Sequence, residues 1–150
     1  MRLRKTGLLG IATLLLPAAG WAQVALGGTG QPPYFQGALD KIADALISDG
    51  VKVKVLSSEA KSRNTLLDEM KSPGYNDLLY ITLHNPRDNH NDASRGDIVA
   101  ECYVGGKKVW EEKSKGPLFL GISREHEINT ILDGIVKKIG KRAGGPCVTK

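Results

Sequence analysis

The chain has 150 residues, of which 41% are hydrophobic and 25% are charged. This length predicts one domain of ordinary size, long enough to bury a core without the help of a metal. The formal net charge is +5, but three of the basic residues, Arg2, Arg4 and Lys5, stand at the amino terminus. The rest of the chain is close to neutral, so we expect neither nucleic acid nor an anionic membrane as its partner.

Residues 1–22 have the pattern of a secretory signal peptide. A basic start is followed by the apolar run Leu8–Leu16, which Pro17 ends, and then by small residues at the positions that signal peptidase reads in Gly20–Ala22. The apolar run is shorter than the roughly 20 residues of a membrane-spanning helix. We therefore predict cleavage after Ala22, a mature domain of residues 23–150 with no membrane span, and a periplasmic or secreted location.

The mature chain contains two cysteines, Cys102 and Cys147. In an exported protein an isolated pair is expected to form a disulfide bond. A redox-active pair would favour close spacing such as C-x-x-C, whereas these two lie far apart in the sequence. Neither cysteine stands at the cleavage site, so we expect no lipid attachment. Two cysteines without a nearby histidine cluster are too few ligands for a metal ion, so we also predict no metal site.

The first half of the mature chain alternates helix and strand signals. Apolar residues recur at helical spacing from Tyr34 to Asp49, and Gly50 is a natural C-terminal cap. The segment Val51–Val55 alternates valine with lysine, as a half-buried strand does. Ser62 can cap a short helix that ends before Pro73, and a further strand is predicted over 77–84.

A glycine-rich stretch, Gly27–Gly30, lies between a possible short strand, Gln23–Leu26, and the first predicted helix. Phosphate-binding loops occur at such positions. A dinucleotide fingerprint would require a third glycine where Pro33 stands, and the Gly-Lys-Ser/Thr of a P-loop is missing. We therefore interpret the stretch as a turn, and we predict no cofactor.

The clearest element is a hairpin over 97–113. Two β-rich runs flank Gly105-Gly106, and glycines tolerate the positive φ that a two-residue hairpin turn requires. This turn predicts that Val104 pairs with Lys107, Cys102 with Val109, and Glu101 with Trp110. Cys102 and Val109 would then face the core, while Tyr103, Lys108 and Trp110 would lie on the opposite face.

The last predicted helix runs from Ser123 to Arg142, with acidic residues in its first turn and basic residues in its last. Three amphipathic helices need a sheet to cover. We therefore predict an α+β two-layer sandwich, in which a mixed sheet with a β-hairpin in the C-terminal half carries about three helices on one face. Cys102 on the inner face and Cys147 after the last helix would lie on the same side.

This order of elements resembles small periplasmic α/β domains. It is similar to the amino-terminal domain of TolB and to envelope assembly proteins such as LpoB and CsgG. The residues that carry the resemblance are the hairpin Val104–Lys107 with Val109-Trp110 after it, and the closing helix from Ser123 to Arg142. The resemblance implies a fold and a role in the cell envelope, and it transfers no site residues. The missing lipid anchor departs from the lipoprotein members.

Two candidate metal motifs are incomplete. His126-Glu127 begins the zinc-protease pattern H-E-x-x-H, but Thr130 stands where the second histidine should be. The polar segment His84–Asp97 loosely resembles a calcium loop without its central glycine and terminal glutamate. We interpret this segment as a solvated connection. A rival interpretation makes it the site of a small hydrolase or metal-dependent enzyme that uses His84, His90 and Asp92.

The predicted outer sheet face is the stronger candidate site. Aromatic residues beside lysines suit a protein or glycan partner, although cross-strand packing that shields the sheet would use the same residues. The candidate binding residues are Lys52, Lys54, Tyr80, Tyr103, Lys108 and Trp110. The favoured function is thus a non-enzymatic, exported binding or assembly domain of the bacterial cell envelope, which acts through an open sheet face or edge on an envelope protein or glycan.

Overall fold

The computed structural model describes residues 23–32, 34–71, 74–84, 96–116 and 124–150. The predicted signal peptide, its cleavage site, His90 and Asp92 lie outside these residues. Within them, no helix is long and apolar enough to cross a membrane.

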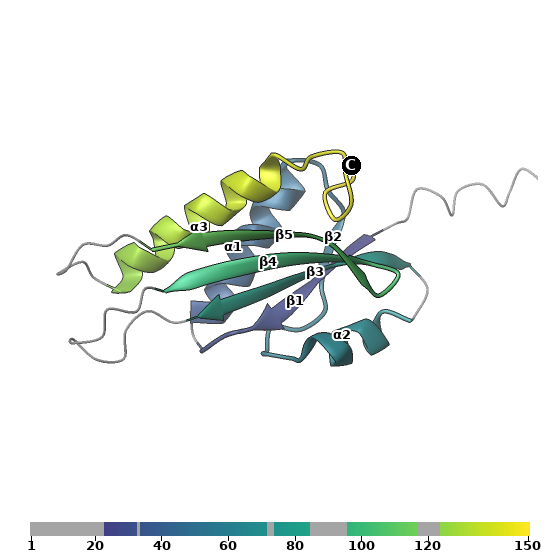
Figure 1. Ribbon diagram of the computed structural model, residues 1–150, viewed down its shortest axis with the longest axis horizontal. Coiled ribbons are helices and arrows are strands. Elements are labelled where there is room, and N and C mark those ends of the chain that lie inside the picture. The colour runs from purple at the N-terminus through teal and green to yellow at the C-terminus, as the bar shows by residue number, and fades with distance from the viewer. Residues whose placement is uncertain (1–22, 33, 72–73, 85–95, 117–123) are drawn as a thin grey trace, which may run out of the picture.

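The described residues form one five-stranded mixed sheet and three helices (Figure 1). The strand order is β2-β1-β3-β4-β5; β1 pairs in parallel with β2 and β3, and the β3–β4 and β4–β5 pairs are antiparallel. The predicted α+β class, mixed sheet and C-terminal-half hairpin are confirmed. The elements are β1 (Gln23–Thr29), α1 (Tyr34–Ser48), β2 (Val53–Val55), α2 (Arg63–Glu69), β3 (Tyr75–His84), β4 (Asp97–Val104), β5 (Lys107–Lys115) and α3 (Arg124–Gly140).

Helices α1 and α3 cover one face of the sheet, which we call the inner face (Figure 1). Each helix buries one apolar stripe, as the helical spacing of its residues predicts. Ile131 and Ile135 of α3 are completely buried there, together with Ile81 of β3 and Ile98 of β4. The main hydrophobic core therefore lies between this face and the two long helices.

Helix α2 packs on the opposite, outer face, which corrects the prediction that all three helices lie on one face. Leu66 of α2 is completely buried in a second cluster with Leu78 and the two tyrosines Tyr80 and Tyr103. The reason lies in β3, where the neighbouring residues Leu78 and Leu79 point to opposite faces and both are inaccessible to solvent. A central strand that is apolar on both faces needs cover on both.

The glycine-rich stretch extends β1 rather than ending it, so the predicted turn over 27–30 is wrong. Gly27 and Gly28 lie inside the strand, opposite Tyr80 and Ile81 of β3. A Cβ at Gly28 would stand only 1.8 Å from the carbonyl oxygen of Ile81, and one at Gly27 would stand 2.6 Å from the Leu66 side chain. These glycines therefore let α2 and β3 approach the backbone of β1 closely.

The hairpin contains a β-bulge that the sequence analysis did not predict. Val104 pairs with Lys107 as expected, but Cys102 pairs with Trp110 because one extra residue, Val109, is inserted in β5. The extra residue moves every following side chain of β5 to the other face. Trp110 is consequently 8% exposed and belongs to the inner core, while Val109 is 47% exposed. The prediction that Trp110 faces outward and Val109 inward is wrong.

Candidate binding surface

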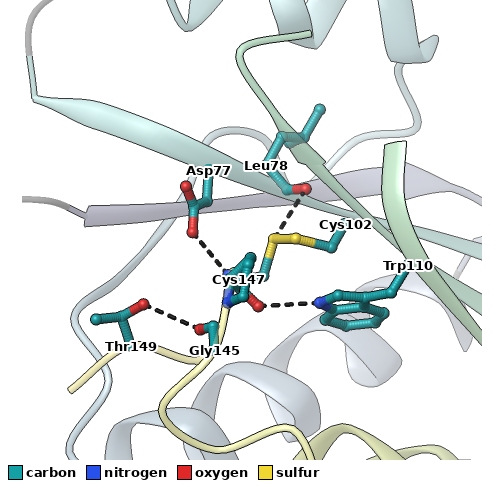
Figure 2. The surroundings of a disulfide bond; sticks show 8 residues. Asp77, Leu78, Cys102, Trp110, Gly145, Cys147 and Thr149 are labelled. Atoms are coloured by element: carbon teal, nitrogen blue, oxygen red, sulfur yellow. Dashed lines mark hydrogen bonds between the residues drawn. A yellow bond between two sulfur atoms is a disulfide. The ribbon is translucent and has the colours of Figure 1, made fainter. Parts of the chain in front are cut away.

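The predicted disulfide bond between Cys102 and Cys147 is present and buried (Figure 2). Two hydrogen bonds hold the chain around it. The amide of Cys147 donates to Asp77 Oδ2 at 2.6 Å, and Trp110 Nε1 donates to the carbonyl oxygen of Pro146 at 3.0 Å. The chain after α3 is therefore fixed against the inner face of the hairpin both covalently and by hydrogen bonds.

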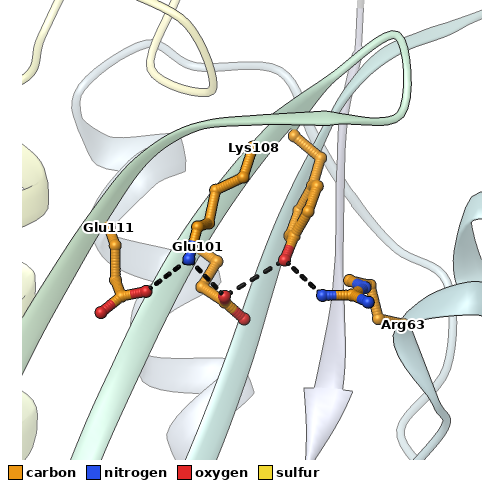
Figure 3. Close-up of polar contacts among 5 residues, drawn as sticks. Arg63, Glu101, Lys108 and Glu111 are labelled. Carbon is orange, nitrogen blue, oxygen red and sulfur yellow. Dashed lines mark hydrogen bonds and ion pairs between the residues drawn. The ribbon is translucent and has the colours of Figure 1, made fainter.

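A connected set of polar side chains crosses the outer face of β4 and β5 (Figure 3). Tyr103 Oη accepts a hydrogen bond from Arg63 Nη1 at 3.0 Å and donates to Glu101 Oε1 at 3.1 Å. Lys108 Nζ donates to Glu101 Oε1 at 3.3 Å and to Glu111 Oε2 at 2.8 Å. We call these five residues the outer network. Its side chains come from α2, β4 and β5, so the tertiary structure assembles it.

The outer network favours the charged state of its cations. Hydrogen bonds to Glu111 and Glu101 raise the pKa of Lys108, and the hydrogen bond to Tyr103 raises the pKa of Arg63. Burial raises the pKa of nearby Tyr80, and the negative charge of Glu101 adds to that effect. The surface therefore presents fixed charges of both signs near neutral pH.

The structure divides the six predicted binding residues among different places. Tyr103 and Lys108 belong to the outer network. Tyr80 lies on the same face but beneath the chain before α2, where its hydroxyl donates to the carbonyl oxygen of Lys61 at 2.9 Å. Trp110 lies on the inner face, on the other side of the sheet from Tyr80 and Tyr103.

The two remaining predicted residues lie at the far edge of the sheet. Lys54, in β2, places its ammonium 5.9 Å from the ring centroid of Tyr75. Lys52 is exposed just before β2, and its carbonyl oxygen accepts from the amide of Val24 at 2.9 Å. Strands β1 and β3 separate this edge from β4, so the six residues do not form one surface.

Of the rival enzymatic site the structure describes His84 and Asp97, which are hydrogen-bonded to each other at the end of β3 and the start of β4. His84 Nδ1 lies 2.5 Å from Asp97 Oδ1, and Lys113 Nζ lies 3.0 Å from Asp97 Oδ2. Burial alone would raise the pKa of Asp97, but these two hydrogen bonds outweigh it and lower the pKa. The described residues contain no group of three His, Cys, Asp or Glu side chains placed to hold a metal.

The incomplete zinc motif on α3 has a structural explanation. Glu127 is buried, and its Oε1 accepts a hydrogen bond from the amide of Gly96 at 3.1 Å. His126 is exposed beside it, and the hydroxyl of Thr130 donates back to the carbonyl oxygen of His126. Glu127 therefore ties α3 to the start of β4.

Four residues of the outer surface were missed by the sequence analysis: Arg63, Val109, Glu111 and Lys113. Arg63 was missed because the sequence does not reveal that α2 crosses to the outer face. Val109, Glu111 and Lys113 were missed because the bulge reverses the facing of β5 beyond Lys108. The many charged residues along Lys107–Lys115 were the available signal, since a charged, exposed strand is typical of a sheet edge.

No model of a known protein family matches the chain, and no curated protein matches it. Its fold is similar to that of PelC from Paraburkholderia phytofirmans. A crystal structure of the PelC dodecamer aligns with a TM-score of 0.54 at 12% identity, covering 85% of this chain and 88% of that one. A point variant of the same dodecamer gives 0.53 at 12% identity, covering 86% and 89%. At this identity the likeness shows the fold alone.

Proposed function

We propose that the chain is an exported, non-enzymatic binding or assembly domain of the bacterial cell envelope. Its contact surface would be the outer side of the β4–β5 hairpin. This surface consists of Val99, Glu101, Lys108, Val109, Glu111 and Lys113, and we call it the hairpin surface. A pattern typical of signal peptides, a disulfide bond and the resemblance to envelope domains support the location.

The observation that carries the proposal is the unequal cover of the outer face. Helix α2 contacts β1 and β3 and buries Tyr80 and Tyr103, whereas no described helix packs on the outer side of β5. An exposed apolar residue, Val109, adjoins the fixed charges of the outer network. A preorganised polar surface around an apolar contact suits a protein partner, because little ordering entropy remains to be lost on binding.

The face is a better contact site than the free edge of β5. The amide of Gly116 donates to the carbonyl oxygen of Gly96, toward β4. Residues whose backbone groups point toward and away from the neighbouring strand alternate along an antiparallel pair, so the carbonyl oxygen of Lys113 points away from β4. Lys138 Nζ of α3 donates to this oxygen. The bulge and the charges along β5 further disfavour the addition of another strand.

PelC, which has a similar fold, forms a dodecamer, so assembly of several chains is compatible with this architecture. In-cell photocrosslinking tests the proposal, with the crosslinking residue placed at Val109. The matched control is Ile47 of α1, an exposed apolar residue (56%) on the inner-face side of the molecule. We expect one discrete crosslinked product from position 109 and none from position 47.

Combining Glu111→Lys with Lys113→Glu preserves the net charge but reverses the arrangement of charges on the hairpin surface. The captured product should therefore disappear in this double variant. A second copy of the chain in the product would indicate assembly, and a different protein would indicate binding. Equal capture from both positions would contradict the proposal. Zinc binding seen by native mass spectrometry and lost in His90→Ala would favour the rival enzyme instead.

A further inference from the structure

A hollow lies away from the hairpin surface, between the C-terminal end of α3 and β5. It has a volume of about 340 Å³ and is open on one side. Its lining combines an aromatic ring, a proline, a carboxylate and two cations. The lining residues are Trp110, Glu112, Lys141, Arg142, Gly145 and Pro146. We call it the Trp110 groove.

The guanidinium of Arg142 is held in a defined position in this groove. Its central carbon lies 5.0 Å from the Trp110 ring centroid, a cation–π distance. Arg142 Nε and Nη2 both contact Glu112 Oε1, at 2.8 and 2.7 Å. These contacts use one edge of the guanidinium. Among the described residues, neither Arg142 Nη1 nor Glu112 Oε2 has a partner.

The opposite wall is fixed by the disulfide bond. Pro146 accepts the hydrogen bond from Trp110 Nε1, and the next residue, Cys147, is bonded to Cys102 (Figure 2). Cys102 is itself the strand partner of Trp110. The groove is therefore formed before any ligand arrives, which lowers the entropy lost on binding.

The charges around the groove favour a ligand with negative charge. The side chain of Lys141 is exposed and has no ion pair or hydrogen bond with another described residue. Lys138 stands in the last turn of α3 and Arg142 just after the helix, and Glu112 is the single carboxylate of the lining. A small inorganic anion would be attracted by the cations but repelled by Glu112. A ligand that carries hydroxyl donors as well as a carboxylate satisfies both kinds of group.

We propose that the Trp110 groove binds an acidic saccharide, a sugar that carries a carboxylate. The carboxylate accepts hydrogen bonds from Lys141 Nζ and Arg142 Nη1, and a sugar hydroxyl donates to Glu112 Oε2. The apolar C–H face of the sugar ring packs on Pro146, beside the largely buried ring of Trp110. This site is separate from the hairpin surface, so its existence does not depend on the proposed function.

A trimer of galacturonic acid is a suitable ligand for the test, with the disulfide-intact protein. Binding is followed by calorimetry and by the NMR signal of the Trp110 indole N–H, which reports on the groove wall. We expect a saturable shift of that signal. The variant Lys141→Glu removes a charge-assisted hydrogen bond and reverses the charge at this position. It should weaken binding by about tenfold or more.

Lys137→Glu is the matched control, because it makes the same charge change in the last turns of α3, outside the groove. It should leave the affinity within about twofold, since an exposed charge that contacts no ligand atom is partly screened in physiological salt. A neutral glucose trimer and inorganic phosphate should leave the indole signal unmoved. Equal losses in both lysine variants, equal binding of the glucose trimer or of phosphate, or no shift with the galacturonate trimer would overturn the proposal.

Discussion

The two faces of the sheet differ in what covers them and therefore in what a mutation there should do. Two long helices and a disulfide bond cover the inner face, where apolar packing dominates. One short helix covers part of the outer face, and a hydrogen-bonded network of charges crosses the rest. Stability is thus expected to depend mainly on the inner face, while the outer face has groups that a partner can contact.

The largest expected effect is the loss of the disulfide bond. Replacing Cys102 and Cys147 together with alanine should lower the free energy of unfolding by about 4 kcal/mol, because the unfolded chain is no longer constrained by the loop that the bond closes. Denaturant unfolding measures the loss. Adding reductant should destabilise the parent protein by a similar amount and leave the variant unchanged. A parent protein insensitive to reductant would contradict this account.

A slightly smaller loss is expected from the inner core. Ile135→Ala should cost about 3 kcal/mol, because it removes a completely buried side chain and leaves a cavity between α3 and the sheet. The matched change on the surface is Ile47→Ala, at an exposed position of α1. That control should alter stability by less than about 0.5 kcal/mol. Similar losses at both positions would mean that α3 is not docked as described.

The outer network should contribute less. Tyr103→Phe keeps the buried ring but removes the hydroxyl that accepts from Arg63 and donates to Glu101. We expect a loss of about 1 kcal/mol, the usual net value of one intramolecular hydrogen bond. Combining it with Arg63→Gln should give a loss smaller than the sum of the two single changes, because both break the same contact. Strict additivity in this double-mutant cycle would show that the two groups do not interact.

The smallest effect concerns the pH dependence at the end of the hairpin. The pKa of Asp97 is lowered by His84 and Lys113, so its stabilising contribution is present above its ordinary value of 3.8 and is lost as the pH falls through the lowered value. Asp97→Asn should therefore be less stable than the parent above about pH 5, by less than ~1 kcal/mol because both partners are largely exposed. The two proteins should converge in acid. A difference that persists or grows in acid would have the wrong sign.

The inner face was largely predictable from the sequence. The apolar stripes of α1 and α3 need only the helical period to be recognised, and the pairing of Cys102 with Cys147 follows from the predicted export and the number of cysteines. The outer face was not predictable in the same way. Leu78 to Ile81 is a continuous apolar run, which indicates burial on both faces, but it does not say which helix provides the second cover.

Local sequence thus determined the class of fold, most of the elements, the two-residue turn at Gly105-Gly106 and the cysteine pair. These features depend on residue spacing and backbone preference within a few positions. Only the tertiary structure decided the facing of Trp110 and Val109, because inserting one residue in β5 reverses every side chain after it at little local cost. The crossing of α2 was decided in the same way, by where the sheet still had apolar surface to bury.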